Sequence, residues 1–233
     1  MGVTSGYSAI DHQPTSPARM DLAPYIEQTL LKPEATPSDV EAHCLRAAGH
    51  GFFGVCVAPR FVPLARRCVG RSGLSVVTVV AFPFGASASE IKAAEARRAV
   101  ADGADEIDMV MALGDALADD FDAVEADVRS VRDATPARVL KVILETGYLT
   151  DARIDHAARA AVRAGADFVK TSTGFGPRGA SVADIELLAR AVEGHAGIKA
   201  SGGIRTRAAA LEMIRAGATR IGTSSGVDMV RGL

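Results

Sequence analysis

Lys170 is the residue whose surroundings in the sequence point most clearly to chemistry. It follows the apolar residues Phe168 and Val169 and precedes a loop that contains Gly174. A short apolar run is typical of a buried strand, and an ammonium group at the edge of a core costs free energy unless it is paired or its pKa falls. The side chain therefore either extends outward to solvent or acts as an amine in a reaction.

A second lysine, Lys199, lies in the next apolar run. The chain has only five lysines against 21 arginines, and lysine, unlike arginine, can lose its proton when it is buried and then act as a nucleophile. If the two runs are neighbouring strands, Lys170 and Lys199 approach each other and each ammonium lowers the other's pKa. This arrangement would keep one amine neutral and the other charged, as a Schiff-base lysine requires.

Asp108 could face the same site and pass protons through a water molecule. For either lysine alone, the alternative is a structural salt bridge or a stem that extends to solvent. Two lysines facing one carboxylate favour the catalytic interpretation.

The elements that must position these residues alternate between short apolar runs and amphipathic stretches, a pattern of repeated strand-helix units around a parallel sheet. The spacing predicts strands over 25–31, 53–58, 76–82, 106–111, 139–144, 168–171, 198–200 and 220–222. It predicts helices over 38–48, 61–69, 89–101, 121–132, 151–164, 182–192 and 207–216, with a short closing helix after Ser225.

Several helix-to-strand joints repeat one device, as in DGADEI, AGADFV and AGATRI, where a glycine can end the helix before the next strand. Eight such units predict an α/β fold of the (β/α)8 TIM barrel type, in a single domain over 21–233 behind a flexible extension over 1–20. An open doubly wound sheet is the main alternative, but no GxGxxG follows the first predicted strand.

In such a barrel the active site lies at the carboxyl ends of the strands. The predicted ends carry Asp105, Glu106 and Asp108 on strand four, Glu145 on strand five, Lys170 on strand six and Lys199 on strand seven. The loops over 201–203 and 222–226 are rich in glycine and serine and follow strands seven and eight, where barrels often bind phosphate.

Composition excludes several classes of protein. The formal charge of -2, without a block of lysine or arginine, argues against nucleic-acid or membrane partners. Three cysteines without a CxxC pair suit a reducing compartment, and the first twenty residues lack the apolar core of a signal peptide, so we expect a cytoplasmic protein.

Beyond these patterns, the chain closely resembles the deoxyribose-phosphate aldolases, class I aldolases of the (β/α)8 type. The matching segments run in order over nearly the whole chain outside the N-terminal extension: IEQTLLKPEAT, VCVAPRFV, VVAFPFG, GADEIDMVM, LKVILETGYL, ADFVKTSTGF, IKASGGIRT and IGTSSG.

The resemblance implies that Lys170 forms the Schiff base, that Lys199 lowers its pKa and that Asp108 relays protons. It implies that substrate or its phosphate contacts Thr173, Gly174, Gly202, Gly203, Ser224 and Ser225. The implied reaction is reversible cleavage of 2-deoxy-D-ribose 5-phosphate to acetaldehyde and D-glyceraldehyde 3-phosphate, in deoxyribose phosphate catabolism, without a metal or another cofactor. We expect a homo-oligomer, with a dimer favoured.

Three departures from the family pattern leave roles open. Glu27 and Gln28 stand where many members have Asp-His, and Phe175 stands where some members have a lysine near the phosphate, with Arg178 nearby as a possible replacement. The C-terminal tyrosine that some members use in proton transfer has no counterpart before Leu233.

Two other functions fit part of the pattern. A different phosphate-binding barrel, such as a sugar-phosphate isomerase or another Schiff-base lyase, would share the glycine-rich loops, and an isomerase would retain activity without Lys170. A barrel that only binds sugar phosphates would be stabilised by them without turnover, but binding alone needs no amine of perturbed pKa.

Overall fold

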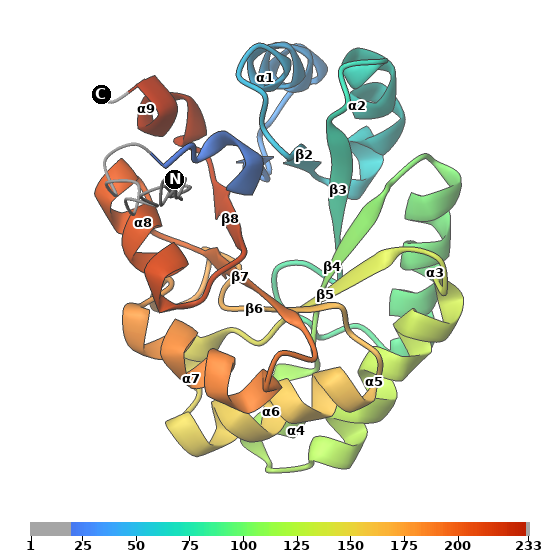
Figure 1. Cartoon of the computed structure of the whole chain (residues 1–233). Helices are drawn as coiled ribbons and strands as arrows, with labels where there is room; N and C mark the ends of the chain where they lie inside the picture. Colours follow the sequence, from blue (N-terminus) through green and yellow to red (C-terminus); the bar gives the residue numbers. More distant parts are fainter. Residues whose placement is uncertain (1–19, 232–233) are drawn as a thin grey trace, which may run out of the picture.

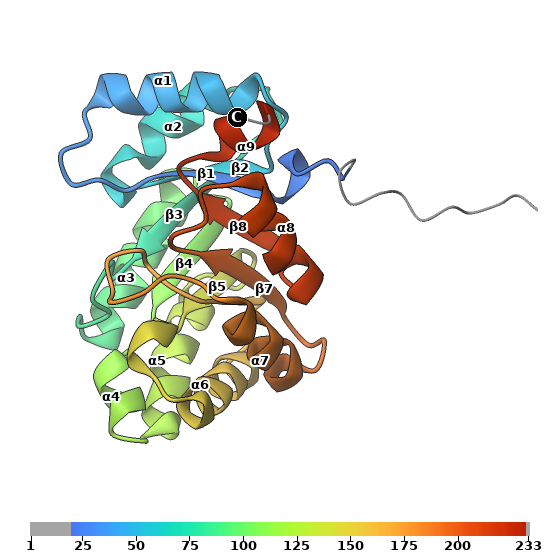
Figure 2. The same ribbon diagram turned by 90° about the vertical axis from the view of Figure 1, so that its left-hand side faces the viewer.

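The computed structural model describes residues 20–231, and within this span eight parallel strands close into a barrel in chain order. Helices surround the strands on the outside (Figures 1 and 2). The strands are β1 (Ile26–Leu30), β2 (Gly54–Val57), β3 (Ser75–Val80), β4 (Glu106–Val110), β5 (Val139–Ile143), β6 (Phe168–Lys170), β7 (Gly197–Ser201) and β8 (Arg220–Thr223). The predicted (β/α)8 barrel is confirmed.

The α-helices follow the predicted order. They are α1 (Pro37–Ala48), α2 (Val62–Val69), α3 (Ser89–Ala101), α4 (Leu113–Leu117), α5 (Phe121–Ala134), α6 (Asp151–Arg163), α7 (Val182–Val192), α8 (Arg207–Ala216) and α9 (Gly226–Arg231). Single 3-10 turns are η2 (Ala23–Tyr25), η3 (Pro59–Phe61) and η4 (Thr146–Tyr148). The sequence pattern missed α4, because five residues are too few to show a helical period.

The predicted extension over 1–20 falls almost wholly on residues 1–19, which lie outside the described part of the chain. In residues 20–231, no helix combines the length and the apolar character needed to cross a membrane.

Glycines at the helix-to-strand joints adopt the predicted left-handed conformation. The φ angle is 108° at Gly103 and 90° at Gly165, a region that residues with a side chain rarely enter. Each glycine lets the chain leave its helix and turn directly into the next strand, so the strand starts at a fixed point. Fixed starting points keep the inward-facing positions of neighbouring strands aligned.

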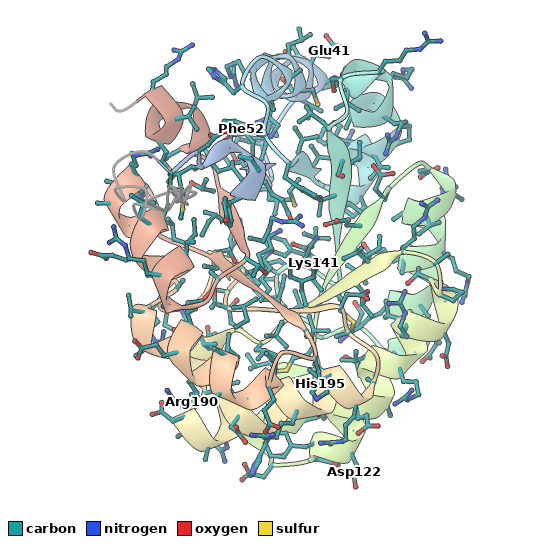
Figure 3. All side chains as sticks on the ribbon, viewed as in Figure 1. Glu41, Phe52, Asp122, Lys141, Arg190 and His195 are labelled. Atoms are coloured by element: carbon teal, nitrogen blue, oxygen red, sulfur yellow. The ribbon has the colours of Figure 1, made fainter. Side chains whose placement is uncertain are left out.

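The two faces of the strands have different surroundings. The outward faces join one large hydrophobic cluster with the helices, including Val55, Val76 and Leu140. Inside the barrel, a second apolar cluster of described residues consists of Cys56, Val77 and Val79. Branched apolar side chains usually fill the interior of such a barrel, whereas here charged side chains occupy much of it. Lys141 lies at the centre of the barrel (Figure 3).

Candidate active site

Four basic and three acidic side chains form a continuous set of ion pairs inside the barrel, and we call this set the buried charge network. Its members are Glu27, Glu106, Asp108, Lys141, Lys170, Lys199 and Arg220. All seven are at most 9% exposed. They come from six different strands, so the closed sheet brings together residues that lie up to 193 positions apart.

Asp108 on β4 bonds directly to both of the other predicted catalytic residues, Lys170 and Lys199. Its Oδ2 atom accepts hydrogen bonds from Lys170 Nζ at 2.8 Å and from Lys199 Nζ at 2.6 Å, and its Oδ1 atom accepts one from Lys141 Nζ at 2.8 Å. Burial alone would raise the pKa of Asp108, but the three ammonium groups outweigh it and hold the pKa well below its ordinary value. Asp108 is therefore ionised at neutral pH.

The other two carboxylates lie deeper in the barrel. Glu106 contacts Lys141 at 2.6 Å, while Glu27 contacts Lys141 at 3.3 Å and also pairs with Lys199. Arg220 completes the network through Glu27 at 2.9 Å and Glu106 at 3.4 Å. Burial would raise the pKa of Glu27, but Lys141 and Lys199 lower it overall.

Lys170 is the least compensated cation of the network. Lys141 contacts three carboxylates, Lys199 and Arg220 contact two each, and Lys170 contacts only Asp108. With four basic groups and three carboxylates, full ionisation would leave one positive charge unbalanced in a medium where charge is costly. Deprotonating Lys170 removes fewer ion pairs with the network carboxylates than deprotonating any other cation of the network would.

The pKa shifts of the lysines follow this difference in partners. Burial lowers the pKa of Lys170, the repulsion from Lys199 lowers it further, and Asp108 offsets only part of the effect. Burial would also lower the pKa of Lys199, but Asp108 and Glu27 outweigh it and raise the pKa. The pKa of Lys170 is therefore lowered on balance, as expected for the neutral amine, whereas that of Lys199 is raised on balance because Lys199 has a second carboxylate partner.

Lys170 reaches the floor of a cavity of about 240 Å³ at the carboxyl ends of the strands. Five of the six residues predicted to contact substrate line it: Thr173, Gly174, Gly202, Gly203 and Ser224. Ser225 does not line the cavity; its N–H donates to Thr223 Oγ1 at 3.0 Å, and its carbonyl accepts from the N–H of Met229 in α9.

Two basic side chains on the cavity wall were not among the predicted binding residues. Lys32 follows β1, and Arg205 follows the glycine pair after β7. Within the described residues, neither forms an ion pair with a carboxylate, so both charges are available to an anion in the cavity. The sequence signal was present, because both lie just beyond predicted strand ends.

The structure places the residues of the first two departures. Glu27 belongs to the buried charge network, and Gln28 ties β1 to the loop after β8, donating to Ser224 O at 2.9 Å and accepting from Gly226 N at 3.0 Å. Phe175 lines the cavity with its side chain half exposed. Arg178 does not line it, because its guanidinium pairs with Asp184 at the start of α7.

Two of the predicted strand-end residues lie at the start of β4 instead of its carboxyl end. Asp105 precedes β4, where it pairs with Arg66 and accepts a hydrogen bond from Val76 N at 2.8 Å, so it lies at the opposite end from the cavity. Placing Asp105 and Glu106 at the carboxyl end of strand four was wrong, because β4 starts at Glu106. Lys141 was overlooked because it lies in mid-strand, and the shortlist considered only strand ends.

Comparison with known proteins places the chain in a family. Residues 8–231 match the model of the DeoC/LacD family aldolase. A deoxyribose-phosphate aldolase of Deinococcus radiodurans is 56% identical over 213 residues, which cover 91% of this chain and 97% of that protein. One from Thermus thermophilus is 54% identical with the same coverage of both chains.

A solved structure agrees with the sequence relatives. The tetrameric deoxyribose-phosphate aldolase from Aeropyrum pernix superposes with a TM-score of 0.85 at 35% identity, covering 93% of this chain and 91% of that one. A family model that matches nearly the whole chain, close relatives that align over almost their entire length and the shared barrel lead to one conclusion. The chain belongs to the DeoC/LacD family of aldolases.

Proposed function

We propose that the chain cleaves 2-deoxy-D-ribose 5-phosphate reversibly into acetaldehyde and D-glyceraldehyde 3-phosphate, with Lys170 as the Schiff-base nucleophile. The observation that carries the proposal is the position of Lys170: it is the least compensated amine of the buried charge network and the network lysine on the cavity lining. The substrate is that named for the deoxyribose-phosphate aldolases to which the chain is similar, and the cavity supports it by combining an amine with groups suited to bind an anion.

The first step forms the imine. The neutral Lys170 amine adds to the sugar aldehyde in its open-chain form, one proton passes from nitrogen to the former carbonyl oxygen, and a second proton from solvent lets that oxygen leave as water. The resulting iminium is a cation, so this step places a positive charge next to the Asp108 carboxylate, which stabilises it. Lys199 stays charged throughout, because two carboxylates hold its proton.

The second step breaks the carbon-carbon bond. A base removes the proton of the 3-hydroxyl group, the 3-oxygen forms a carbonyl as the bond between carbons 2 and 3 breaks, and D-glyceraldehyde 3-phosphate leaves. The electron pair of the broken bond moves toward the iminium nitrogen to give an enamine. Asp108, acting through a water molecule, can accept this proton and return it to carbon 2. Hydrolysis of the second imine then releases acetaldehyde and restores Lys170.

The far side of the cavity would bind the phosphate. Gly202 and Gly203 lack side chains, so their backbone can approach an anion closely, and Ser224 adds a hydroxyl donor. Arg205 and Lys32 add positive charge without competing carboxylates among the described residues. Holding the phosphate there orients the acceptor carbonyl toward the enamine carbon in the synthetic direction.

Trapping the imine tests this proposal. Incubation with acetaldehyde and sodium borohydride should add one ethyl group to the peptide that contains Lys170, as measured by mass spectrometry, and abolish turnover in parallel. Lys170→Met should keep the fold and lose both the adduct and the activity. An unmodified Lys170 peptide in an enzyme that turns over would refute the Schiff base, and activity in Lys170→Met would favour an isomerase.

We further propose a cytoplasmic homo-oligomer in deoxyribose phosphate catabolism, with a dimer favoured. The tetrameric state of the Aeropyrum pernix relative supports self-association in general. Sedimentation equilibrium of the full chain measures the number of subunits directly.

A further inference from the structure

We infer that Glu145 is a positioning residue that fixes the cavity wall after β6 and thereby sets the preference for a phosphorylated acceptor. The inference rests on the proposed function for the identity of that acceptor. Its physical basis is the buried carboxylate of Glu145, which accepts hydrogen bonds from Thr173 alone among the described residues. Thr173 belongs to the loop over 173–176, which we call the wall.

The backbone at Glu145 adopts an unusual conformation that the neighbouring strand pairs hold in place. Glu145 directly follows the end of the β5 pairing and has a φ of 53°, in the left-handed region that residues with side chains rarely enter. On one side of it, Leu144 N donates to Lys170 O at 2.9 Å, and on the other, Thr146 N donates to Thr171 O at 3.0 Å. The strained residue is therefore fixed against the strand that carries Lys170.

The side chain of Glu145 turns toward the loop that follows Lys170. It is 3% exposed, and in the described part of the chain no cation pairs with it. Its two oxygens accept from Thr173 N at 3.3 and 3.1 Å, and Thr173 Oγ1 also donates to Oε2. Thr173 Oγ1 in turn accepts from Phe175 N at 3.0 Å. A buried carboxylate without a cation depends on these donors, so Glu145 and the loop hold each other in place.

The loop also packs closely against the carboxylate of Glu145. A methyl group added at Gly176 would lie 2.8 Å from Glu145 Oε1, so the chain passes directly over the carboxylate and a larger residue there would displace it. The loop from Thr173 to Gly176 has little freedom to move while Glu145 keeps its position.

The loop is a wall between two cavities. Thr173 and Phe175 line the cavity that contains Lys170, and they also line a smaller one of about 90 Å³ together with Glu145, Phe84 and Tyr148. The smaller cavity has an aromatic rim and belongs to the side away from the phosphate-binding glycines. If the wall loses its anchor, the acceptor site widens toward this apolar space.

The consequence is a change in specificity. Removing the carboxylate takes away the acceptor of two donor groups of Thr173, and hydrogen bonds to charged groups are among the stronger ones in proteins. A small phosphorylated aldehyde would then fit a wider site poorly, whereas an aldehyde with an aromatic substituent could enter the side cavity. The position of Lys170 would not change, because its strand pairing and its bond to Asp108 do not involve the carboxylate of Glu145.

Kinetics of three variants test this role. In Glu145→Ala we expect KM for D-glyceraldehyde 3-phosphate, with acetaldehyde as donor, to rise about tenfold or more, while borohydride trapping of acetaldehyde on Lys170 stays at the wild-type level. The kcat/KM ratio of phenylacetaldehyde to D-glyceraldehyde 3-phosphate should rise by a similar factor. Glu145→Gln, which keeps one acceptor oxygen, should fall between wild type and Glu145→Ala. Glu212→Gln, an exposed glutamate on α8 without an ion pair in the described residues, is the matched control.

A second readout does not depend on catalysis. The chain contains no tryptophan, so Phe175→Trp places a single reporter on the wall. Adding Glu145→Ala to this background should increase acrylamide quenching of the tryptophan, and adding Glu212→Gln should not. The inference is overturned if quenching is unchanged, or if both acceptors lose kcat/KM equally. Failure to trap an imine in the wild-type enzyme would instead count against the proposed function, since quenching would still report the wall.

Discussion

Removing Lys199 should make Lys170 a poorer nucleophile at neutral pH, although Lys199 itself forms no bond to substrate in the proposed reaction. Both nitrogens bond the same Oδ2 atom of Asp108, at 2.8 and 2.6 Å, so they lie at most about 5.4 Å apart. At an effective dielectric constant of about 20, two positive charges at that separation repel by about 3 kcal/mol. Lys199→Met removes this repulsion and leaves three basic groups facing three carboxylates, so Lys170 would keep its proton.

The assay is the pH profile of kcat/KM, whose acidic limb reports the deprotonation of Lys170 in the free enzyme. In Lys199→Met the limb should move to higher pH, and activity at pH 7 should fall on the order of 100-fold, with much of it recovered in alkaline buffer. Arg215→Met, which removes an exposed cation from α8, should leave the profile unchanged. An unshifted acidic limb in a folded Lys199→Met protein would refute the electrostatic role of Lys199.

Three further predictions follow from the same contacts. Asp108→Asn leaves lysines facing one another without their shared carboxylate, so urea unfolding should show a loss of about 3–5 kcal/mol together with loss of turnover; wild-type stability would contradict the network. Burial would raise the pKa of Glu27, but attraction by Lys141 and Lys199 lowers it overall in the folded protein. The ionised Glu27 therefore stabilises the fold fully at pH values above the ordinary carboxyl pKa. This stabilisation is lost as the pH falls through the lowered pKa of the folded state. The wild-type unfolding free energy should therefore drop below about pH 4, and Glu27→Gln should show a shallower dependence. Arg205→Ala and Lys32→Met should each raise KM for the phosphorylated sugar about tenfold or more without affecting unphosphorylated deoxyribose, whereas Arg178→Ala, whose guanidinium serves Asp184, should leave both KM values unchanged.

Most of the fold could be predicted from local signals. Several strands, such as β4, β6 and β8, lie between a glycine joint and a loop, and the helices over 89–101, 182–192 and 207–216 have the predicted bounds. Where bounds differ, the cause is tertiary: β7 extends over Gly197–Ser201 because its ends pair with β6 and β8, and such pairing leaves no mark in the strand's own composition.

The candidate site was only partly predictable. Lys170, Lys199 and Asp108 were found because a charge in an apolar strand is unusual, and the structure brings the three together. Lys141 and Glu27 are also charged residues within predicted strands. They were overlooked because the prediction considered only the residues at strand ends and not those that point into the middle of the barrel. Inward-facing positions alternate along a strand, so Glu106 and Asp108 on one strand already predicted two charges inside the barrel.

What the sequence could not give is the distribution of partners among the lysines. Lys170 and Lys199 look equivalent in the chain, since each lies in a short apolar run. Only the closed barrel brings Glu27 of the first strand to Lys199 on the seventh, 172 positions away. This contact makes Lys199 the charged lysine and leaves Lys170 with a single carboxylate.

The most direct test of this account is the titration of the individual lysines by NMR with 13Cε- and 15Nζ-labelled lysine. Five lysines give a spectrum simple enough to assign by single substitutions. Lys170 should lose its proton below the ordinary lysine pKa, while Lys141 and Lys199 stay protonated throughout the accessible range. If Lys199 or Lys141 deprotonates before Lys170, or if the pKa of Lys170 is not lowered, the assignment of Lys170 as the neutral amine is contradicted.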